Sequence, residues 1–158
     1  LSIGAGYLSN ISDSGTITEN VTGGTALTDY VPAWEVHGSL TTGPVVFYGG
    51  YMTAKDSFAS GELAFKSQGA QPAAWNLEAV YVTEIMNKET TLAITMQASE
   101  EALVLSMPET RYGASATVQM FPNYSTTLEY LHDNDYSTSD GGTGNDGHTA
   151  TLKIAAEF

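Results

Sequence analysis

Four aspartates near the C-terminal end of the chain could bind a divalent cation, because carboxylate oxygens are the ligands that Ca²⁺ prefers. They share one polar stretch and are Asp133, Asp135, Asp140 and Asp146. Residues 141–146 read GGTGND, half of a calcium-binding nonapeptide, but such sites need stacked repeats and this motif occurs once. The sequence therefore predicts a flexible external loop, with a weak cation site that bridges lipopolysaccharide phosphates as the alternative.

Catalysis would need a nucleophile placed beside a base and a carboxylate. His132 and Asp133, with His148, could supply the base and the carboxylate, and the chain has many serines. It contains neither a GxSxG elbow nor an HExxH motif that would place a nucleophile or a catalytic metal. We therefore expect no enzymatic activity and no cofactor.

The composition excludes several other classes of protein. The chain has 158 residues, with 5 Lys plus Arg against 18 Asp plus Glu and a net charge of −13, so it should repel nucleic-acid phosphates. It has no cysteine, which excludes disulfides and thiolate metal sites. No apolar run approaches the roughly 18 residues that a membrane-spanning helix needs. A membrane-spanning β-barrel stays possible, because its signal is a two-residue alternation.

Eight segments show this alternation between an apolar face and a small or polar face, the period of a β-strand. They are residues 1–11, 30–40, 45–54, 74–86, 90–99, 112–121, 124–133 and 148–158. Short turns at 42–44, 87–89 and 122–123 alternate with long polar links at 12–28, 55–72, 100–109 and 135–147. This layout is typical of membrane barrels. The sequence thus predicts an all-β, antiparallel, up-and-down transmembrane β-barrel of about eight strands, as one domain over residues 1–158 or the C-terminal part of a larger barrel.

The small or polar face is predicted to line the lumen, because Ser, Thr, Ala and Gly suit a packed interior. The charged or amide residues on it are Glu35, His37, Glu78, Glu84, Arg111, Gln119, Glu129, Lys153 and Glu157. The favoured interpretation is a structural network in which carboxylates pair with Arg111 and Lys153, so that no buried charge is left alone. The alternative is a polar path that prefers cations, because carboxylates outnumber bases on this face.

Aromatic residues near the strand ends are predicted to lie at the two membrane interfaces. Those on the long-loop side are Tyr30, Trp34, Trp75, Tyr112 and Tyr130, and those on the short-turn side are Phe121, Tyr124 and Phe158. No charge interrupts the centre of an apolar face, where lipid would penalise it. We therefore expect a bacterial outer-membrane location, with membrane lipid and lipopolysaccharide as partners.

The last strand resembles the C-terminal signature of Gram-negative outer-membrane proteins, which implies recognition by the barrel-assembly machinery. Residues 61–158 also resemble the C-terminal part of LbtU-type siderophore porins, in GAQP at 69–72, KETTL at 88–92, YLHD at 130–133 and DYSTSDGGTG at 135–144. This resemblance implies an outer-membrane barrel that takes up ferric siderophores, and it transfers no catalytic residue. Family members are longer than this chain, and eight strands alone close into a tube without a channel.

Two other functions remain open at the level of the sequence. The first is a small, non-enzymatic structural or adhesive outer-membrane barrel with acidic external loops. The second is a soluble, lipocalin-like binder of small molecules, whose apolar faces would line an interior core. Porin-like uptake is the function that the resemblance favours.

Overall fold

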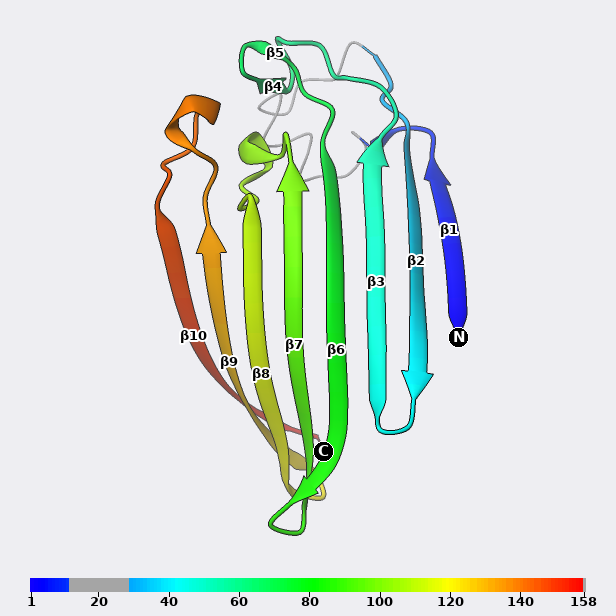
Figure 1. Cartoon of the computed structure of the whole chain (residues 1–158), viewed down its shortest axis with the longest axis vertical. Coiled ribbons are helices and arrows are strands. Elements are labelled where there is room, and N and C mark those ends of the chain that lie inside the picture. The colour runs from blue at the N-terminus through cyan, green and yellow to red at the C-terminus, as the bar shows by residue number, and fades with distance from the viewer. Residues whose placement is uncertain (12–28, 158) are drawn as a thin grey trace.

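Eight antiparallel strands form one curved sheet in the computed structural model, which describes residues 1–11 and 29–157 (Figure 1). They are β1 (Ser2–Leu8), β2 (Ala33–Thr42), β3 (Val45–Ala54), β6 (Ala73–Ile85), β7 (Lys88–Glu100), β8 (Thr110–Phe121), β9 (Tyr124–Asn134) and β10 (Asp146–Ala156). Each strand pairs with its neighbour along the chain, in the order β1-β2-β3-β6-β7-β8-β9-β10. The predicted all-β, up-and-down arrangement is therefore confirmed. The predicted link 12–28 lies outside the described residues.

Tight hairpins join the strands at one end of the sheet. Asn87 and Met86 both have positive φ, 59° and 54°, as a two-residue turn of the type I′ class requires. The predicted turn at 87–89 is thus displaced by one residue, because Ile85 pairs with Lys88 and the latter begins β7. At the β2–β3 turn Gly43 has φ 56°, a conformation that glycine adopts without steric strain.

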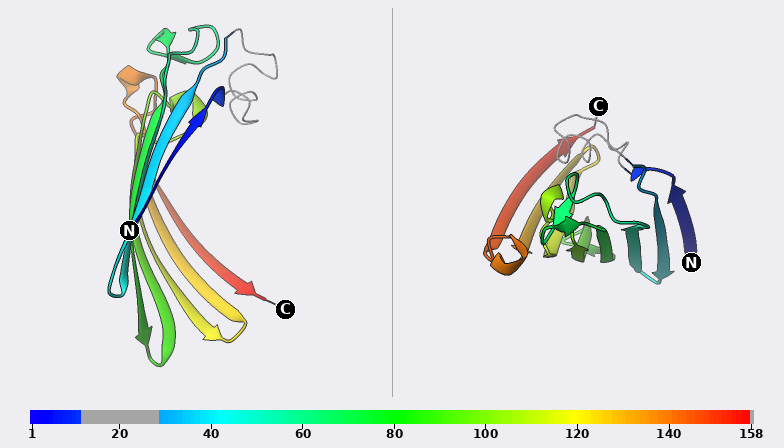
Figure 2. Two further views of the ribbon diagram at one scale, coloured as in Figure 1. Left: turned by 90° about the vertical axis from the view of Figure 1, so that its right-hand side faces the viewer. Right: turned by 90° about the horizontal axis from the view of Figure 1, so that it is seen from above.

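The sheet is open, and the expectation that these eight strands close into a barrel is wrong for this chain. Strands β1 and β10 lie at opposite edges of the sheet and do not pair with each other. Seen from above, the sheet forms an arc with these two strands at its ends (Figure 2). Alternation fixes which strands are neighbours and which face each residue takes, but it is the same in a closed tube and in an open arc. The sequence pattern therefore could not predict closure.

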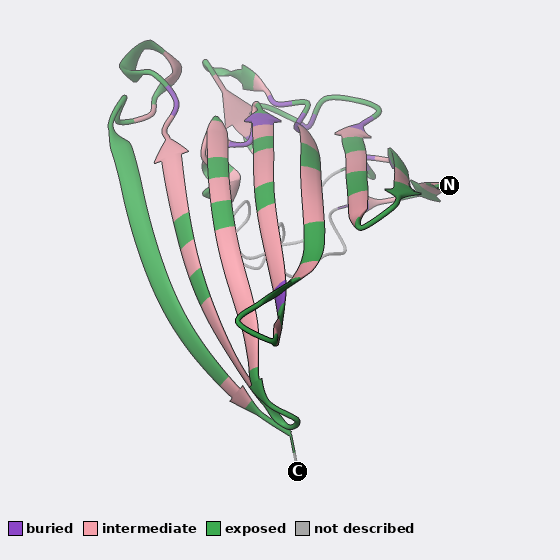
Figure 3. Ribbon diagram, turned by 60° about the horizontal axis from the view of Figure 1, so that its bottom comes forward, coloured by how far each residue is buried: buried purple, intermediate pink, exposed green. Residues whose placement is uncertain are grey.

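The buried apolar core lies among the long loops at the other end of the sheet, where the buried residues gather (Figure 3). Its members are Ile11, Val31, Ala33, Ala54, Phe58, Leu63 and Ala70. A small hairpin of β4 (Ala64–Phe65) and β5 (Gln68–Gly69) packs there, close to the 3₁₀ turn η2 (Leu103–Leu105). An ion pair of 2.5 Å joins Lys66 to Asp140 in η3 (Thr138–Asp140). Three of the long links thus form one connected cap.

Tyr136 links two of these loops through its buried hydroxyl. That oxygen lies 2.8 Å from Ser99 Oγ and accepts the N–H of Ala102 at 3.2 Å. Because Ser99 donates its own hydrogen to the Pro108 carbonyl at 2.7 Å, Tyr136 is the donor to Ser99. One hydroxyl therefore satisfies a buried donor and a buried acceptor.

Replacing Tyr136 with phenylalanine is expected to destabilise the cap by about 1–3 kcal/mol, because it leaves the Ala102 N–H buried without an acceptor. Amide hydrogen exchange should show faster exchange at Ala102. The amides in the middle of β7 serve as an internal control and should be unaffected. Unchanged protection at Ala102 would contradict this role of the hydroxyl.

Candidate functional site

The strand register divides the sheet into two chemically distinct faces, because residues directly opposite each other in antiparallel strands lie on the same face. One row runs through Leu152, Leu128, Ala116, Leu92, Tyr81 and Val45. The adjacent row on the other side runs through Thr151, Glu129, Ser115, Ala93, Val80 and Val46. We call the side of the first row the apolar face and the side of the second row the polar face.

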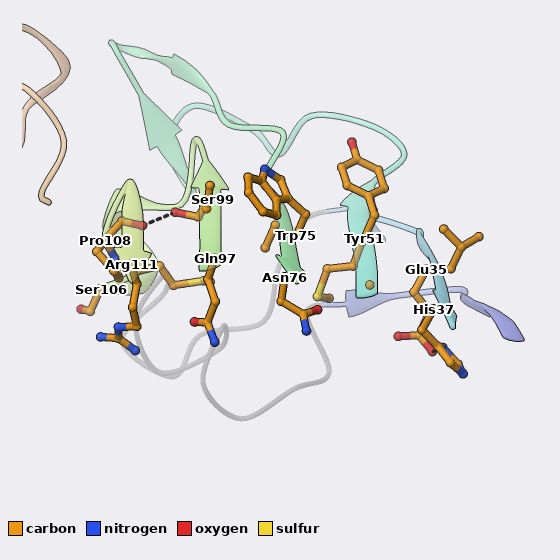
Figure 4. A pocket seen from close by; sticks show the side chains of 16 residues that line it. Glu35, His37, Tyr51, Trp75, Asn76, Gln97, Ser99, Ser106, Pro108 and Arg111 are labelled. Atoms are coloured by element: carbon orange, nitrogen blue, oxygen red, sulfur yellow. Dashed lines mark hydrogen bonds and ion pairs between the residues drawn. The ribbon is translucent and has the colours of Figure 1, made fainter. Parts of the chain in front are cut away.

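A row of hydrogen-bonding side chains crosses the polar face near the long-loop end. In register order it consists of His37, Gly50, Asn76, Gln97, Arg111 and Asp133. A cavity of about 470 Å³ lies along this row from His37 to Arg111 and is also lined by Glu35 and Ser99. Figure 4 shows Asn76, Gln97 and Arg111 extending to one side of the sheet, away from Trp75. This cavity is the candidate functional site.

Arg111 and Asp133 form the strongest polar contact of the row. Nε and a terminal nitrogen of Arg111 donate to the two carboxylate oxygens of Asp133, at 2.6 and 2.7 Å. Such two-pronged pairs hold the guanidinium in one plane. At the other end of the row, His37 Nδ1 lies 3.7 Å from a carboxylate oxygen of Glu35. The row therefore combines a fixed guanidinium at Arg111 with the amides of Asn76 and Gln97 and, at its other end, the carboxylate of Glu35.

Glycines provide the space for these large polar side chains. A Cβ at Gly50 would lie 2.8 Å from the Asn76 side-chain oxygen, and a Cβ at Gly4 would lie within 3 Å of the His37 ring. Both contacts are closer than carbon atoms normally tolerate, so a larger residue would displace the polar side chain. The glycines in β1 and β3 are thus needed for the shape of the polar face.

The predicted lumen-lining residues lie on the polar face, although only some of them reach the cavity. Glu35, His37 and Arg111 line it. Glu78, Glu129 and Lys153 lie on the same face nearer the short turns, and so does Glu84, opposite Glu89. Gln119 donates to the carbonyls of Phe121 and Pro122, and Glu157 follows the end of β10.

The sequence pattern does not assign to a site two residues that line the cavity, Asn76 and Gln97. Asp133, which holds Arg111 at the edge of the cavity, is predicted from the sequence as part of the acidic loop. The predicted network pairs inward glutamates with Arg111 and Lys153. In the structure Arg111 pairs with Asp133 instead, and among the described residues Lys153 forms no ion pair. Alternation along residues 124–133 places Asp133 on the same face as Glu129, and the register then sets it opposite Arg111.

Three of the four aspartates of the predicted cation site, Asp133, Asp135 and Asp146, line one pocket beside Arg111, and Asp140 is not among its lining residues. Asp133 binds Arg111, Asp140 binds Lys66, and Asp146 lies at the start of β10. Within residues 1–11 and 29–157, no three His, Cys, Asp or Glu side chains are arranged to hold a metal ion. The described residues therefore do not form the predicted aspartate cation site, and two of its four carboxylates, Asp133 and Asp140, are paired with basic side chains.

Asp135 holds the glycine-rich loop together. Its carboxylate accepts hydrogen bonds from the hydroxyl and the backbone N–H of Thr143, at 2.6 and 2.7 Å, and from the Tyr136 N–H at 2.8 Å. The Thr143 hydroxyl is the largest of the contacts that lower the pKa of this carboxyl below its usual value of 3.8. GGTGND thus folds around a carboxylate rather than around an ion.

The lowered pKa of Asp135 predicts an acid-sensitive loop. The ionised carboxylate stabilises the loop fully above pH values near 3.8, and this stabilisation is lost as the pH falls through the lower pKa of the folded state. Amide exchange at Thr143 should therefore accelerate below about pH 3.8. In Asp135→Asn the exchange should be faster at neutral pH and should no longer respond to this titration.

His132 and Asp133, the predicted base and carboxylate, point to opposite faces because they are consecutive in β9. His132 lies opposite His148 on the apolar face, whereas Asp133 binds Arg111 on the polar face. The two side chains therefore do not form a catalytic pair.

Aromatic residues border the apolar face at both ends. Near the long loops Trp34 packs on Tyr51 with ring centroids 5.4 Å apart, and Trp75 and Tyr112 lie on the same face. The long-loop set also includes Tyr130, on β9, and Tyr30, which is exposed before β2. At the short turns Phe121 packs on Tyr124 at 6.3 Å, and Lys88 lies over the Phe121 ring. Phe158 lies outside the described residues.

The fold and its faces define an up-and-down antiparallel sheet with one exposed apolar side and one polar side. The chain is similar to a UPF0422 protein of Coxiella burnetii, with 32% identity over 157 residues that cover 99% of this chain and 33% of that protein. It is also similar to UPF0422 proteins of Legionella pneumophila strains Lens and Philadelphia 1, with 25% identity over 90% of this chain and 29% of theirs. The chain thus spans about a third of the length of the curated relatives it matches. No protein-family model and no solved structure matches.

Within the described residues, no helix is both long enough and apolar enough to cross a membrane.

Proposed function

We propose that this chain forms part of the wall of an outer-membrane β-barrel, with its apolar face toward lipid and its polar face toward an aqueous lumen. The observation that carries the proposal is the exposure of the apolar face. Ile94, Leu128, Leu152 and Ile154 are 64%, 59%, 66% and 72% exposed. A soluble protein rarely leaves so extended an apolar surface uncovered. A lipid bilayer would cover it.

The spacing of the aromatic residues matches the thickness of a bilayer. Along β8, Phe121 follows Tyr112 by nine residues, which is about 30 Å at the usual rise of a strand. A strand tilted by about 35–45° would then span about 21–25 Å, close to the roughly 25 Å apolar band of outer-membrane barrels. Between these two residues the apolar face of β8 carries only Ala114, Ala116, Val118 and Met120.

The open edges support a barrel wider than eight strands. An exposed edge presents unpaired N–H and C=O groups, which lipid cannot satisfy. The relatives are about three times as long as this chain, so residues beyond the matched third could supply the missing strands. A wider barrel encloses an aqueous channel. We therefore propose passive uptake of small solutes through it, with ferric siderophores as the solutes that the resemblance to LbtU-type porins implies.

Single-channel recording in planar lipid bilayers tests the transport function. The reconstituted protein should produce discrete conductance steps, and the excess of carboxylates on the polar face should make the pore prefer cations. An insulating protein that still shows heat-modifiable migration on gels would exclude the pore and favour a structural barrel. A protein that stays in the aqueous phase without detergent would exclude the membrane location.

A further inference from the structure

Two histidines and a tyrosine form a cluster on the apolar face, near the long-loop end of β9 and β10. His132 and His148 lie directly opposite each other, and their Nδ1 atoms are 3.1 Å apart. The Tyr130 hydroxyl lies 2.7 Å from the same Nδ1 of His148. The polar cavity lies on the other face, so this cluster is separate from the candidate site described above.

One nitrogen of the cluster has more neighbours within hydrogen-bonding distance than it can bind as a neutral group. Nδ1 of a neutral imidazole carries either one hydrogen or one lone pair. His148 Nδ1 nevertheless has two groups within hydrogen-bonding distance, the Tyr130 hydroxyl and His132 Nδ1. A cation placed among these atoms would accept a lone pair from each of them.

We propose that His132, His148 and Tyr130 bind a divalent transition-metal ion of the Zn²⁺, Cu²⁺ or Ni²⁺ type. Imidazole nitrogens suit these ions, whereas Ca²⁺ and Mg²⁺ prefer oxygen ligands. Two nitrogens that bind one ion at about 2.0–2.1 Å, with an angle of about 90–110° between them, lie about 2.9–3.4 Å apart. The observed separation of 3.1 Å shows that the two strands bring both nitrogens within reach of one ion.

The surroundings of the cluster favour a cation. The chain carries a net charge of −13, which raises the local concentration of cations and repels anions such as phosphate. His148 is exposed and lies two positions from the long-loop end of β10, so an ion can reach it from the long-loop side.

Binding requires the imidazole rings to turn. The rings are stacked, with centroids 4.7 Å apart and planes inclined by 26°, so their in-plane lone pairs now run side by side. Rotation about χ2, a torsion with broad preferences in histidine, would direct both lone pairs at one ion.

Titration of the untagged chain with Zn²⁺, followed by calorimetry, tests the proposal. The unaltered protein should bind one equivalent, and His132→Ala or His148→Ala should weaken binding by at least about tenfold, since even a group that only supports a metal ligand contributes about 10–100-fold to affinity. Tyr130→Phe should weaken it less, because both imidazoles remain. His37→Ala is the matched control, since His37 is the third histidine of the chain and lies on the polar face. Binding should survive this change.

Electron paramagnetic resonance of bound Cu²⁺ provides a second measurement that needs no variant. Superhyperfine splitting should report two coordinated nitrogens. Absence of Zn²⁺ binding, binding that persists at full strength in His132→Ala and His148→Ala, or fewer than two nitrogens on Cu²⁺ would each overturn the proposal. All of these results are independent of whether the protein conducts ions, so the metal site and the pore can fail separately.

Discussion

Replacing Leu152 with arginine is expected to destabilise the membrane-embedded protein by about 2–4 kcal/mol, the penalty for a cation near the middle of the lipid-facing side of a barrel strand. Leu152 lies in the middle of β10 on the apolar face and is already 66% exposed. Its replacement therefore removes little protein packing. In water, the same change at such an exposed position would alter stability by less than about 0.5 kcal/mol. The size of the effect thus reports what covers the apolar face.

Thr151→Arg is the matched control for this prediction. Thr151 precedes Leu152 in the same strand, is also exposed, and faces Glu129 across the polar face. Its arginine would meet a carboxylate in an aqueous environment, so stability should be close to that of the unaltered protein. Unfolding in phospholipid vesicles with guanidinium chloride measures both variants. Equal stability of the two variants would rule out lipid contact at the apolar face.

The eight strands and their two faces could be predicted because both depend on local alternation. Alternation places Ala114 and Ala116 on the apolar face of β8. The register pairs them with Ile94 and Leu92 in β7 and with Tyr130 and Leu128 in β9, which alternation places on the same face. A strand that is apolar on one side only has a single register that keeps its faces consistent with its neighbours. The alternation of apolar and polar residues therefore predicts the two faces of the sheet, which strand propensity alone does not.

The curvature of the sheet and the contacts of its cap could not be predicted, because both depend on residues distant in sequence. The ion pair between Lys66 and Asp140 and the bond from Tyr136 to Ser99 join separate loops, and no spacing in the chain indicates them. The β4–β5 hairpin has only two residues in each strand, too few for a visible alternation. The glycine-rich loop was interpreted as a mobile tip, although Asp135 fixes it.

Removing the guanidinium of Arg111 is expected to change both the stability of the sheet and the selectivity of the proposed pore. Arg111→Ala leaves the half-buried carboxylate of Asp133 without its two-pronged partner. Hydrogen bonds to a charged group contribute about 1.5–3 kcal/mol, so a loss of stability of this order is expected. Of the Lys and Arg residues in the part of the chain that the structure describes, only Arg111 lines the polar cavity, so its loss makes the cavity wall more acidic. The preference of the pore for cations should therefore rise.

Two further variants separate the two effects of Arg111. Lys153→Ala also removes one positive charge from the polar face. Among the described residues, however, Lys153 forms no ion pair. This variant should therefore alter selectivity without a comparable loss of stability. The double variant Arg111→Ala/Asp133→Ala should recover part of the stability, because removing both members of a pair leaves no unpaired charge behind. Reversal potentials in a salt gradient report selectivity, and denaturant unfolding reports stability. If the double variant were less stable than Arg111→Ala, the carboxylate would have another stabilising partner, and the Arg111–Asp133 pair would not be the contact that organises this row.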